Sequence, residues 1–127
     1  MRPMKRPSSI ARKTLRMILE ASRDMYPLEF GAILRAEEGV ITELILVPGT
    51  VSGKHHAIFQ LHTLPADFAV VGTIHSHPSG VCEPSDEDLA LFNKFGGIHL
   101  IVGAPYDDGS WAAWTNKGER VPLRVVP

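Results

Sequence analysis

Residues 69–74 narrow the possible folds of this chain more than any other segment. From Ala69 to Ile74 the sequence is short, apolar and rich in β-branched residues, and these features are typical of a strand buried on both faces. His75 and His77 follow this run directly. Because alternate residues of a strand point to the same side, both imidazoles can face one point in space. We therefore expect a buried strand that ends in a pair of histidines.

The rest of the chain predicts further strands and two helices around this buried strand. Ser8 or Ser9 can cap a helix that runs to about Met25, where Pro27 would end it, and a second helix is expected at residues 85–95. This order of elements predicts an α/β fold, close to the α+β class, in which a mixed β-sheet carries flanking helices. Strands are expected at residues 29–34, 40–47, 98–102, 110–115 and 121–126, with a strand-like stretch at 55–62 after a loop at 48–53, and with turns at 37–39, Asp108-Gly109 and Lys117-Gly118.

Length and composition indicate one domain. A chain of 127 residues can build one ordinary core. We expect a basic N-terminal tail at residues 1–7 and a single domain at residues 8–127. The first 23 residues are strongly basic, which is also a property of organellar transit peptides. However, the spacing of Leu15, Ile18 and Leu19 indicates a helix face directed at a core.

The overall charge and the cysteine content exclude several classes of function. The formal net charge is −1, which is no electrostatic signal for binding to nucleic acid or to a membrane surface. No apolar run reaches the roughly 18 residues that a membrane-spanning helix needs. Cys82 is the single cysteine, which excludes an internal disulfide and sites with several cysteine ligands. A reducing compartment suits such a chain, and we expect a cytoplasmic protein.

The segment from His75 to Asp88 carries the residue types of a catalytic zinc site. Asp88 falls in the first turn of the second predicted helix, from which its carboxylate can reach His75 and His77. Two nitrogen ligands and one oxygen ligand leave a fourth position of zinc open to water, whereas a structural site fills all four positions with protein ligands. Bound zinc can bring the pKa of this water to about 7. His75, His77 and Asp88 are therefore the predicted ligands of one Zn²⁺ ion.

Each of these residues also has an interpretation that involves no metal. A single histidine at a strand end is usually a packing or surface residue, although two histidines at i and i+2 after a buried strand favour a metal. Ser85 and Asp88 form Ser-x-x-Asp, which is close to the capping box that begins many helices. Both interpretations of Asp88 can hold together, because a cap fixes where the helix starts and thus where the carboxylate points.

Glu29, followed by the segment His75–Pro78 (His-Ser-His-Pro) and then by Ser85 and Asp88, resembles the signature of the JAMM (MPN+) metalloproteases. That signature is an upstream glutamate, then His-x-His-Pro, then Ser-x-x-Asp after a short loop of fixed length. No signature position departs from the pattern, and the resemblance to small archaeal members extends over nearly the whole chain. It implies the MPN/JAMM fold, whose mixed sheet is distantly similar to that of cytidine deaminases.

The resemblance implies catalytic roles for two further residues. Glu29 would act as the general base toward the attacking water and then as the proton donor to the leaving amine, although its own sequence neighbourhood favours a surface glutamate. Ser85 would donate a hydrogen bond to the oxyanion of the tetrahedral intermediate. Hydrolysis by this route needs no covalent intermediate, so Ser85 is not expected to be a nucleophile.

The resemblance also implies the class of substrate. Family members cleave the peptide or isopeptide bond after the Gly-Gly tail of ubiquitin or of a ubiquitin-like protein, and Gly49–Gly53 and Ser79–Glu83 are candidate walls of such a site. Bacterial members that trim a sulfur-carrier protein provide an alternative, as does a non-catalytic MPN scaffold. A nucleobase deaminase is excluded because the chain contains neither His-x-Glu nor Pro-Cys-x-x-Cys. The oligomeric state stays open.

Other conspicuous residues are expected to serve packing or loop structure. Trp111 and Trp114 lie three apart on one predicted strand and therefore face opposite sides of it. Ser76 could orient the ligand loop or face solvent, and Cys82 could be an inhibitory metal ligand, a redox-sensitive thiol or an inert loop residue. The remaining histidines have no metal-ligand spacing and are expected at the surface or in packing: His55, His56, His62 and His99.

Overall fold

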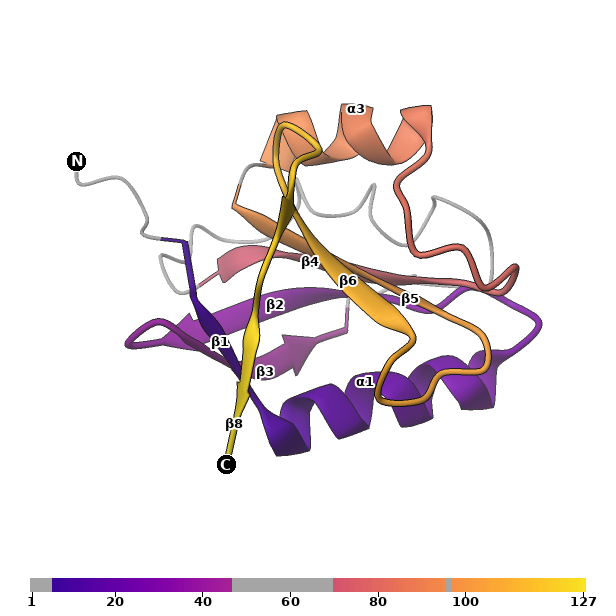
Figure 1. Cartoon of the computed structure of the whole chain (residues 1–127), viewed down its shortest axis with the longest axis horizontal. Coiled ribbons are helices and arrows are strands. Elements are labelled where there is room, and N and C mark those ends of the chain that lie inside the picture. Colours follow the sequence, from indigo (N-terminus) through magenta and orange to yellow (C-terminus); the bar gives the residue numbers. More distant parts are fainter. Residues whose placement is uncertain (1–5, 47–69, 96) are drawn as a thin grey trace.

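The structure consists of one mixed sheet with a helix on each side. It is a computed structural model, and it describes residues 6–46, 70–95 and 97–127. Figure 1 shows α1 (Arg12–Met25) below the sheet and α3 (Asp86–Phe95) above it. The strands are β1 (Ser9–Ala11), β2 (Gly31–Glu37), β3 (Val40–Ile45), β4 (Val70–His77), β5 (Ile98–Gly103), β6 (Trp111–Thr115), β7 (Arg120–Val121) and β8 (Arg124–Val126). Their order is β7-β6-β5-β4-β2-β3-β1-β8. Within the described residues, neither helix is long and apolar enough to cross a membrane.

The strand order shows that the sheet curls on itself. β7 and β8 lie at opposite ends of the order, yet only Pro122 and Leu123 separate them in sequence. The parallel pairs are β1 with β3, β1 with β8, and β4 with β5, whereas the other pairs are antiparallel. The sequence-based prediction of a mixed sheet with flanking helices is therefore confirmed.

β4 is the buried inner strand that the apolar run predicts. It pairs with β2 on one side and with β5 on the other, so both of its edges are hydrogen-bonded. The strand extends further than predicted, because His75 pairs with Gly31 and His77 pairs with Gly103. Both histidines are therefore held within the sheet rather than in the loop that follows.

The hairpin of β2 and β3 is also confirmed, with one shift that concerns Glu29. Glu38 has a φ of 50° and Gly39 a φ of 82°, so the two-residue turn has the two positive φ angles of a type I′ hairpin. However, β2 begins at Gly31, two residues later than predicted. Glu29 therefore lies just before the strand.

The predicted start of the first helix is wrong. Ser9–Ala11 is a strand, not a cap, and α1 begins at Arg12 after Ala11, whose side chain makes no capping bond. This short strand pairs with β3 and β8 and buries Ile10 completely. Pairing with two distant strands satisfies its backbone groups and outweighs the local preference of serine for a helix start.

The prediction is also wrong at the C-terminus, where one strand was expected at residues 121–126. The chain forms β7, breaks at Pro122 and Leu123, and resumes as β8 beside β1. Proline cannot donate to a strand ladder, which favours the break at this point. The predicted turn at Asp108-Gly109 belongs to a longer connection between β5 and β6, whereas the Lys117-Gly118 turn is confirmed with Gly118 at a φ of 80°. The predicted loop at 48–53 and the stretch at 55–62 lie outside the described residues.

Neighbouring residues of β5 belong to different faces of the sheet. Ile98, Leu100 and Val102 join the large apolar cluster that contains Ile18 of α1. His99 and Ile101 alternate with these residues along the strand. The ring of His99 stacks on Phe92 of α3, and Ile101 belongs to the same cluster as Phe92. The sheet therefore has an α1 face and an α3 face, and these names are used below.

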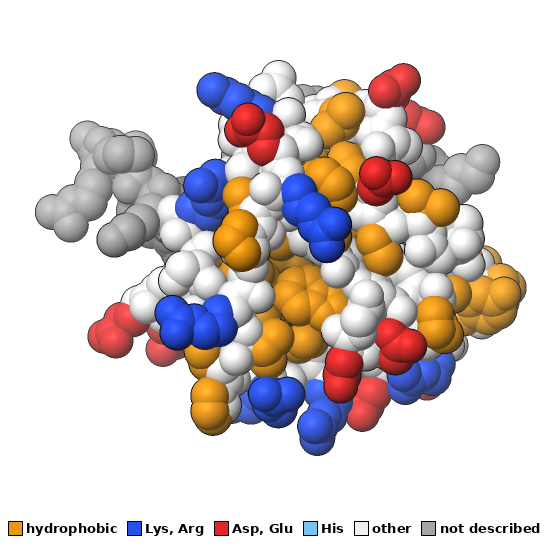
Figure 2. Space-filling view, in the orientation of Figure 1, with side chains coloured by type: hydrophobic (Ala, Val, Ile, Leu, Met, Phe, Trp, Pro, Cys, Tyr) orange, Lys and Arg blue, Asp and Glu red, His pale blue; other side chains and the backbone are white. Residues whose placement is uncertain are grey.

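Figure 2 shows hydrophobic side chains gathered near the middle of one side of the molecule, with acidic and basic side chains around them. A hollow of about 640 Å³ beside β6 and β7 is lined by residues that include Trp111, Val121 and Leu123. All three pack against the α1-face cluster. The lining contains none of the predicted zinc ligands, so the hollow is separate from the site described next.

Candidate metal centre

The three predicted zinc ligands converge on one point of the α3 face. His75 Nε2 lies 2.9 Å from Asp88 Oδ1, and His77 Nε2 lies 3.2 Å from Asp88 Oδ2. The two Nε2 atoms are 3.1 Å apart. Within the described residues, these three side chains form the one group whose ligand atoms all lie within 4.8 Å of one another.

The spacing of these atoms fits a zinc ion. A regular tetrahedron with zinc–ligand bonds of about 2.0–2.2 Å has edges of roughly 3.3–3.6 Å. The observed separations of 2.9, 3.1 and 3.2 Å are a few tenths of an ångström shorter, and the two distances to Asp88 go to different oxygens of its carboxylate. Small outward movements of the side chains would therefore admit the ion. Two neutral imidazole nitrogens and a carboxylate oxygen are also the donor atoms that a catalytic zinc site uses.

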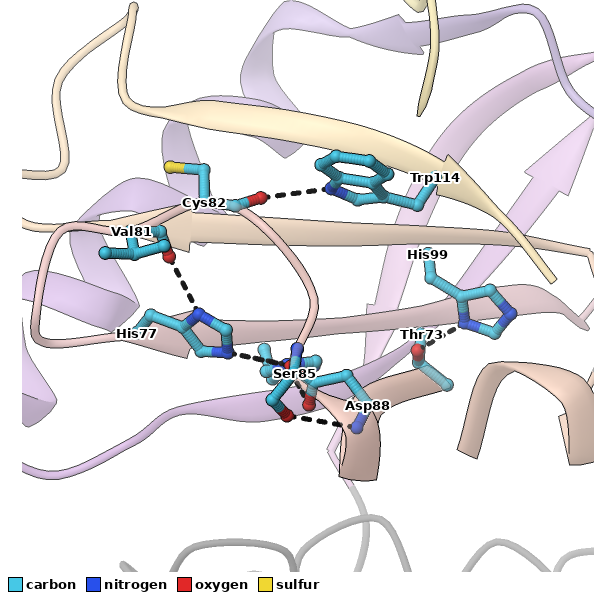
Figure 3. Close-up of polar contacts among 9 residues, drawn as sticks. Thr73, His77, Val81, Cys82, Ser85, Asp88, His99 and Trp114 are labelled. Carbon is cyan, nitrogen blue, oxygen red and sulfur yellow. Dashed lines mark hydrogen bonds and ion pairs between the residues drawn. The ribbon is translucent and has the colours of Figure 1, made fainter. Parts of the chain in front are cut away.

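The loop after β4 fixes the orientation of the His77 ring. His77 Nδ1 lies 2.8 Å from the carbonyl oxygen of Val81 (Figure 3). A carbonyl can only accept a hydrogen bond, so Nδ1 carries the hydrogen and Nε2 is the nitrogen directed at Asp88. His75 differs, because its buried Nδ1 has no hydrogen-bond partner among the residues that the structure describes. The protein therefore controls the ring of His77 through a specific backbone contact.

A capping box at the start of α3 fixes the direction of the Asp88 carboxylate. Ser85 N donates to Asp88 Oδ2 at 2.8 Å, and Asp88 N donates to Ser85 Oγ at 3.2 Å. The helical and the metal-binding interpretations of Ser-x-x-Asp are thus compatible, because one carboxylate both caps the helix and faces the histidines. Burial raises the pKa of Asp88, but the hydrogen bonds from His75 and His77 outweigh it and hold the pKa well below the usual range. Asp88 is therefore ionised, as a metal ligand must be.

The environment of His77 acts in the opposite direction on its own pKa. Burial lowers the pKa of His77, but the hydrogen bonds to Asp88 and to the Val81 carbonyl outweigh burial and raise the pKa above its ordinary value. The negative charge of Glu29 raises it further. The carboxylate of Glu29 is thus close enough to His77 to affect the pKa of the imidazole.

Ser76 ties the Glu29 segment to the ligand strand. Its hydroxyl oxygen accepts a hydrogen bond of 2.7 Å from Phe30 N, and Ser76 N donates to Phe30 O at 2.9 Å. Ser76 is completely buried, so the alternative of a solvent-facing serine is excluded. The residue between the two histidines therefore binds the backbone immediately after Glu29.

Comparison with known proteins identifies the family. Residues 11–117 match the family described as prokaryotic homologues of the JAB domain. A "probable metalloprotease" of Haloferax volcanii is 41% identical over 127 residues, covering 92% of this chain and 78% of the relative. This chain belongs to the JAMM (MPN+) metallopeptidase family.

Solved structures agree with this assignment. A JAB1/MPN domain protein from Archaeoglobus fulgidus has a TM-score of 0.77 and 44% identity, over 94% of this chain and 99% of the other. A structure described as a metalloprotease-like JAMM zinc site in the proteasome and signalosome has a TM-score of 0.76 and 41% identity, over 95% of this chain and 99% of the other. Protein DSY2949 from Desulfitobacterium hafniense is 15% identical with a TM-score of 0.62, over 93% of this chain and 92% of the other, which is a likeness of fold alone.

As a JAMM metallopeptidase, this protein uses zinc as its cofactor.

The histidines without metal-ligand spacing were expected at the surface or in packing. His99 is buried, its Nδ1 atom lies 2.7 Å from Thr73 Oγ1, and its ring stacks on Phe92, which confirms a packing role. The remaining histidines without ligand spacing (His55, His56 and His62) and the loop Gly49–Gly53 lie outside the described residues.

Two contacts of this JAMM centre were not predicted from the sequence. In the first, His77 Nδ1 donates to the carbonyl oxygen of Val81. In the second, Trp114 Nε1 donates to the carbonyl oxygen of Cys82. The Trp114 contact spans 32 residues, so no local sequence pattern could indicate it. Cys82 itself is a free thiol, and burial raises its pKa, which disfavours the reactive thiolate.

Proposed function

We propose that this JAMM metallopeptidase hydrolyses the peptide or isopeptide bond after the C-terminal Gly-Gly of a ubiquitin-like protein. In this proposal His75, His77 and Asp88 hold the zinc ion, Glu29 is the general base and Ser85 assists the oxyanion. The observation that supports it most directly is the approach of two Nε2 atoms and one ionised carboxylate to within hydrogen-bond distance of one another. Two imidazole nitrogens that can each offer a lone pair, together with one buried carboxylate, form a suitable site for a cation.

Each residue would have a distinct task in the reaction. Zinc, when bound, supplies a Lewis acid that lets water lose a proton near pH 7. The Glu29 carboxylate would accept that proton and would later deliver it to the nitrogen of the leaving amine. Glu29 is half-buried and close enough to His77 to influence its charge, which supports this placement.

The exposure and hydrogen bonding of Ser85 support a role in stabilising the transition state. Its side chain is exposed at the start of α3, and its oxygen accepts the bond from Asp88 N. This contact uses the oxygen as an acceptor and leaves the O–H group as a donor. That donor would stabilise the negative charge that develops on the carbonyl oxygen of the scissile bond.

The substrate class rests on family membership and on the form of the loop Ser79–Glu83. Val81 of this loop is 52% exposed and its carbonyl contacts His77, so the loop forms a surface next to the metal centre. A Gly-Gly tail lacks side chains that could clash with such a loop. The single cysteine supports a cytoplasmic location for the reaction.

Two substitutions would test the assignment of roles. Glu29→Gln should retain zinc and lose hydrolysis of both linear and isopeptide-linked Gly-Gly fusions, because the amide cannot accept the proton. His77→Ala should lose zinc and hydrolysis together. Glu20→Gln, at an exposed position of α1, is the matched control and should keep both. Zinc content is measured by elemental analysis and hydrolysis by mass spectrometry of the released proteins.

The outcomes separate the proposed function from its alternatives. Near-normal turnover of the Glu29→Gln variant would remove Glu29 from the mechanism. Trimming of residues from the C-terminus of a sulfur-carrier protein, without cleavage of Gly-Gly fusions, would indicate the other substrate class. A zinc-loaded wild-type protein that cleaves neither substrate would contradict the proposal.

A further inference from the structure

The two tryptophans of the protein make equivalent hydrogen bonds on opposite faces of β6. Trp111 Nε1 donates to Asp108 O at 2.9 Å, within the connection between β5 and β6. Trp114 Nε1 donates to Cys82 O at 3.0 Å, within the loop after the ligand strand. Each indole thus binds a loop carbonyl, but only the Trp114 contact involves the metal-site loop.

Trp114 is packed firmly against the α3 face. It is 9% exposed and clusters with Phe92, Ile101 and Ala112. Cys82 packs against the same cluster. The indole is therefore held by the sheet and the helix, and its N–H group can hold the loop in turn.

The Trp114 contact lies next to the contact that orients His77. Cys82 directly follows Val81, whose carbonyl accepts the bond from His77 Nδ1. Two consecutive carbonyls of the loop therefore accept side-chain N–H groups from two different strands, β4 and β6 (Figure 3). Fixing the second carbonyl restricts the peptide that carries the first.

The two halves of this loop are held in different ways. The first half is a turn in which Gly80 N donates to His77 O, and Gly103 lies so close to Gly80 that an added Cβ would approach its backbone to 2.8 Å. The second half contains the exposed Val81, and its bonds to Ser79 and Gly80 stay within the loop. Two bonds link this half to inner strands of the sheet, one from His77 to Val81 O and one from Trp114 to Cys82 O.

We propose that Trp114 is a positioning residue of the zinc centre. It holds the Cys82 peptide so that the Val81 carbonyl stays against His77 Nδ1 and His77 Nε2 stays directed at the ion. This inference rests on the proposed role of His77 as a zinc ligand. The hydrogen-bond partner of a ligand histidine typically contributes about 10–100-fold to metal affinity. Trp114 does not bond His77 itself but holds the peptide next to its partner, so an effect at the lower end of this range is expected.

The first test compares two substitutions in the full-length protein. Trp114→Phe keeps an aromatic ring but removes the N–H donor, and Trp111→Phe makes the same change on the other face. Zinc affinity is measured by competition with a chromophoric chelator. Trp114→Phe should weaken zinc binding by about tenfold, whereas Trp111→Phe should leave it at the wild-type level. Equal zinc affinities of the two variants would overturn the inference.

The second test uses the wild-type protein and needs no substitution. If the Trp114 bond favours zinc binding, zinc binding must favour that bond to the same degree. Hydrogen exchange of the two indole N–H groups, followed by NMR, should slow at Trp114 when zinc is added and should not change at Trp111. Unchanged exchange at Trp114 would overturn the inference even if the Trp114→Phe variant failed to fold.

The controls distinguish failure of this inference from failure of the proposed function. If the wild-type protein binds no zinc, or if His77→Ala binds it as well as wild type does, the assignment of the ligands is wrong. If zinc binds normally and depends on His77 but not on Trp114, only the positioning role is wrong.

Discussion

The α1 face and the α3 face of the sheet bury different kinds of side chain. The cluster on the α1 face contains 15 buried residues, which include Leu15, Ile18 and Leu19 of the helix itself. Among the residues that the structure describes, the cluster on the α3 face contains four, namely Phe92, Ile101, Ala112 and Trp114. Since apolar burial is the main favourable term in folding, the described residues of the α1 face contribute more apolar stabilisation than those of the α3 face.

On the α3 face, polar groups take the place of apolar packing. His75, Asp88 and His99 are all buried there, at 5% exposure or less. Buried polar groups destabilise a fold unless they are hydrogen-bonded, and these groups bond to one another, to Ser85 and to Thr73. The comparison indicates that the α1 face mainly stabilises the sheet, whereas the α3 face positions the proposed zinc ligands.

Ser85→Ala is expected to have the largest effect of the substitutions that probe this division. Loss of one oxyanion donor should lower kcat by about 100–1000-fold, and loss of the helix cap should cost about 1 kcal/mol of stability. Kinetics on a Gly-Gly fusion and urea unfolding measure the two effects separately.

Ser22→Ala is the matched control on the α1 face. Unlike the exposed Ser85, Ser22 is buried, and its hydroxyl donates to Ile18 O at 2.8 Å. This variant should change the free energy of unfolding by no more than about 1.5 kcal/mol and should leave kcat unchanged. If Ser85→Ala loses stability but keeps its rate, then Ser85 only caps the helix.

A smaller effect is expected from a pair of substitutions within β5. Ile98 and Ile101 are both completely buried, but Ile98 belongs to the α1-face cluster and Ile101 to the α3-face cluster. Ile98→Val and Ile101→Val remove the same methyl-sized group, and each should cost about 0.5–1.5 kcal/mol in urea unfolding. Ile101 pairs with His75 in the sheet, so only Ile101→Val should also weaken zinc binding. Equal zinc affinities in the two variants would show that packing on the α3 face does not support the ligands.

Much of this architecture follows from local sequence patterns. The apolar run before His75 predicts β4, and Ser-x-x-Asp predicts the start of α3, because both signals lie within a few residues of the structure that they specify. The convergence of the ligand atoms then follows from strand alternation and from the capping box. The grouping of these three side chains was therefore accessible from sequence spacing alone.

Features that depend on distant pairing could not be predicted in the same way. β1 is three residues long and exists because β3 and β8 pair with it. The bond between Ser76 and Phe30 spans 46 residues, so the link between Glu29 and the ligand strand appears only in three dimensions. The sequence around Glu29 favours a surface residue, and its catalytic assignment depends on the family resemblance.

The smallest expected effect is a pH dependence that only the α3 face should produce. In the metal-free protein, the bonds of His77 to Asp88 and Val81 raise the pKa of His77 despite its burial. Protonated His77 therefore stabilises the fold fully below the unfolded-state pKa of about 6.5, and this stability is lost as the pH rises through the folded-state pKa. The lowered pKa of Asp88 keeps its carboxylate charged over this window, since its contribution is lost only at much lower pH.

Urea unfolding of metal-free protein between about pH 6 and pH 9 should thus show a decrease in stability that His77→Gln abolishes. Zinc-loaded protein should show the opposite trend, because zinc binds neutral imidazole and competes with protons at low pH. Ile98→Val, on the α1 face, should keep the wild-type pH dependence while being less stable throughout. A pH dependence that persists in His77→Gln would show that His77 is not the group responsible and would contradict this prediction.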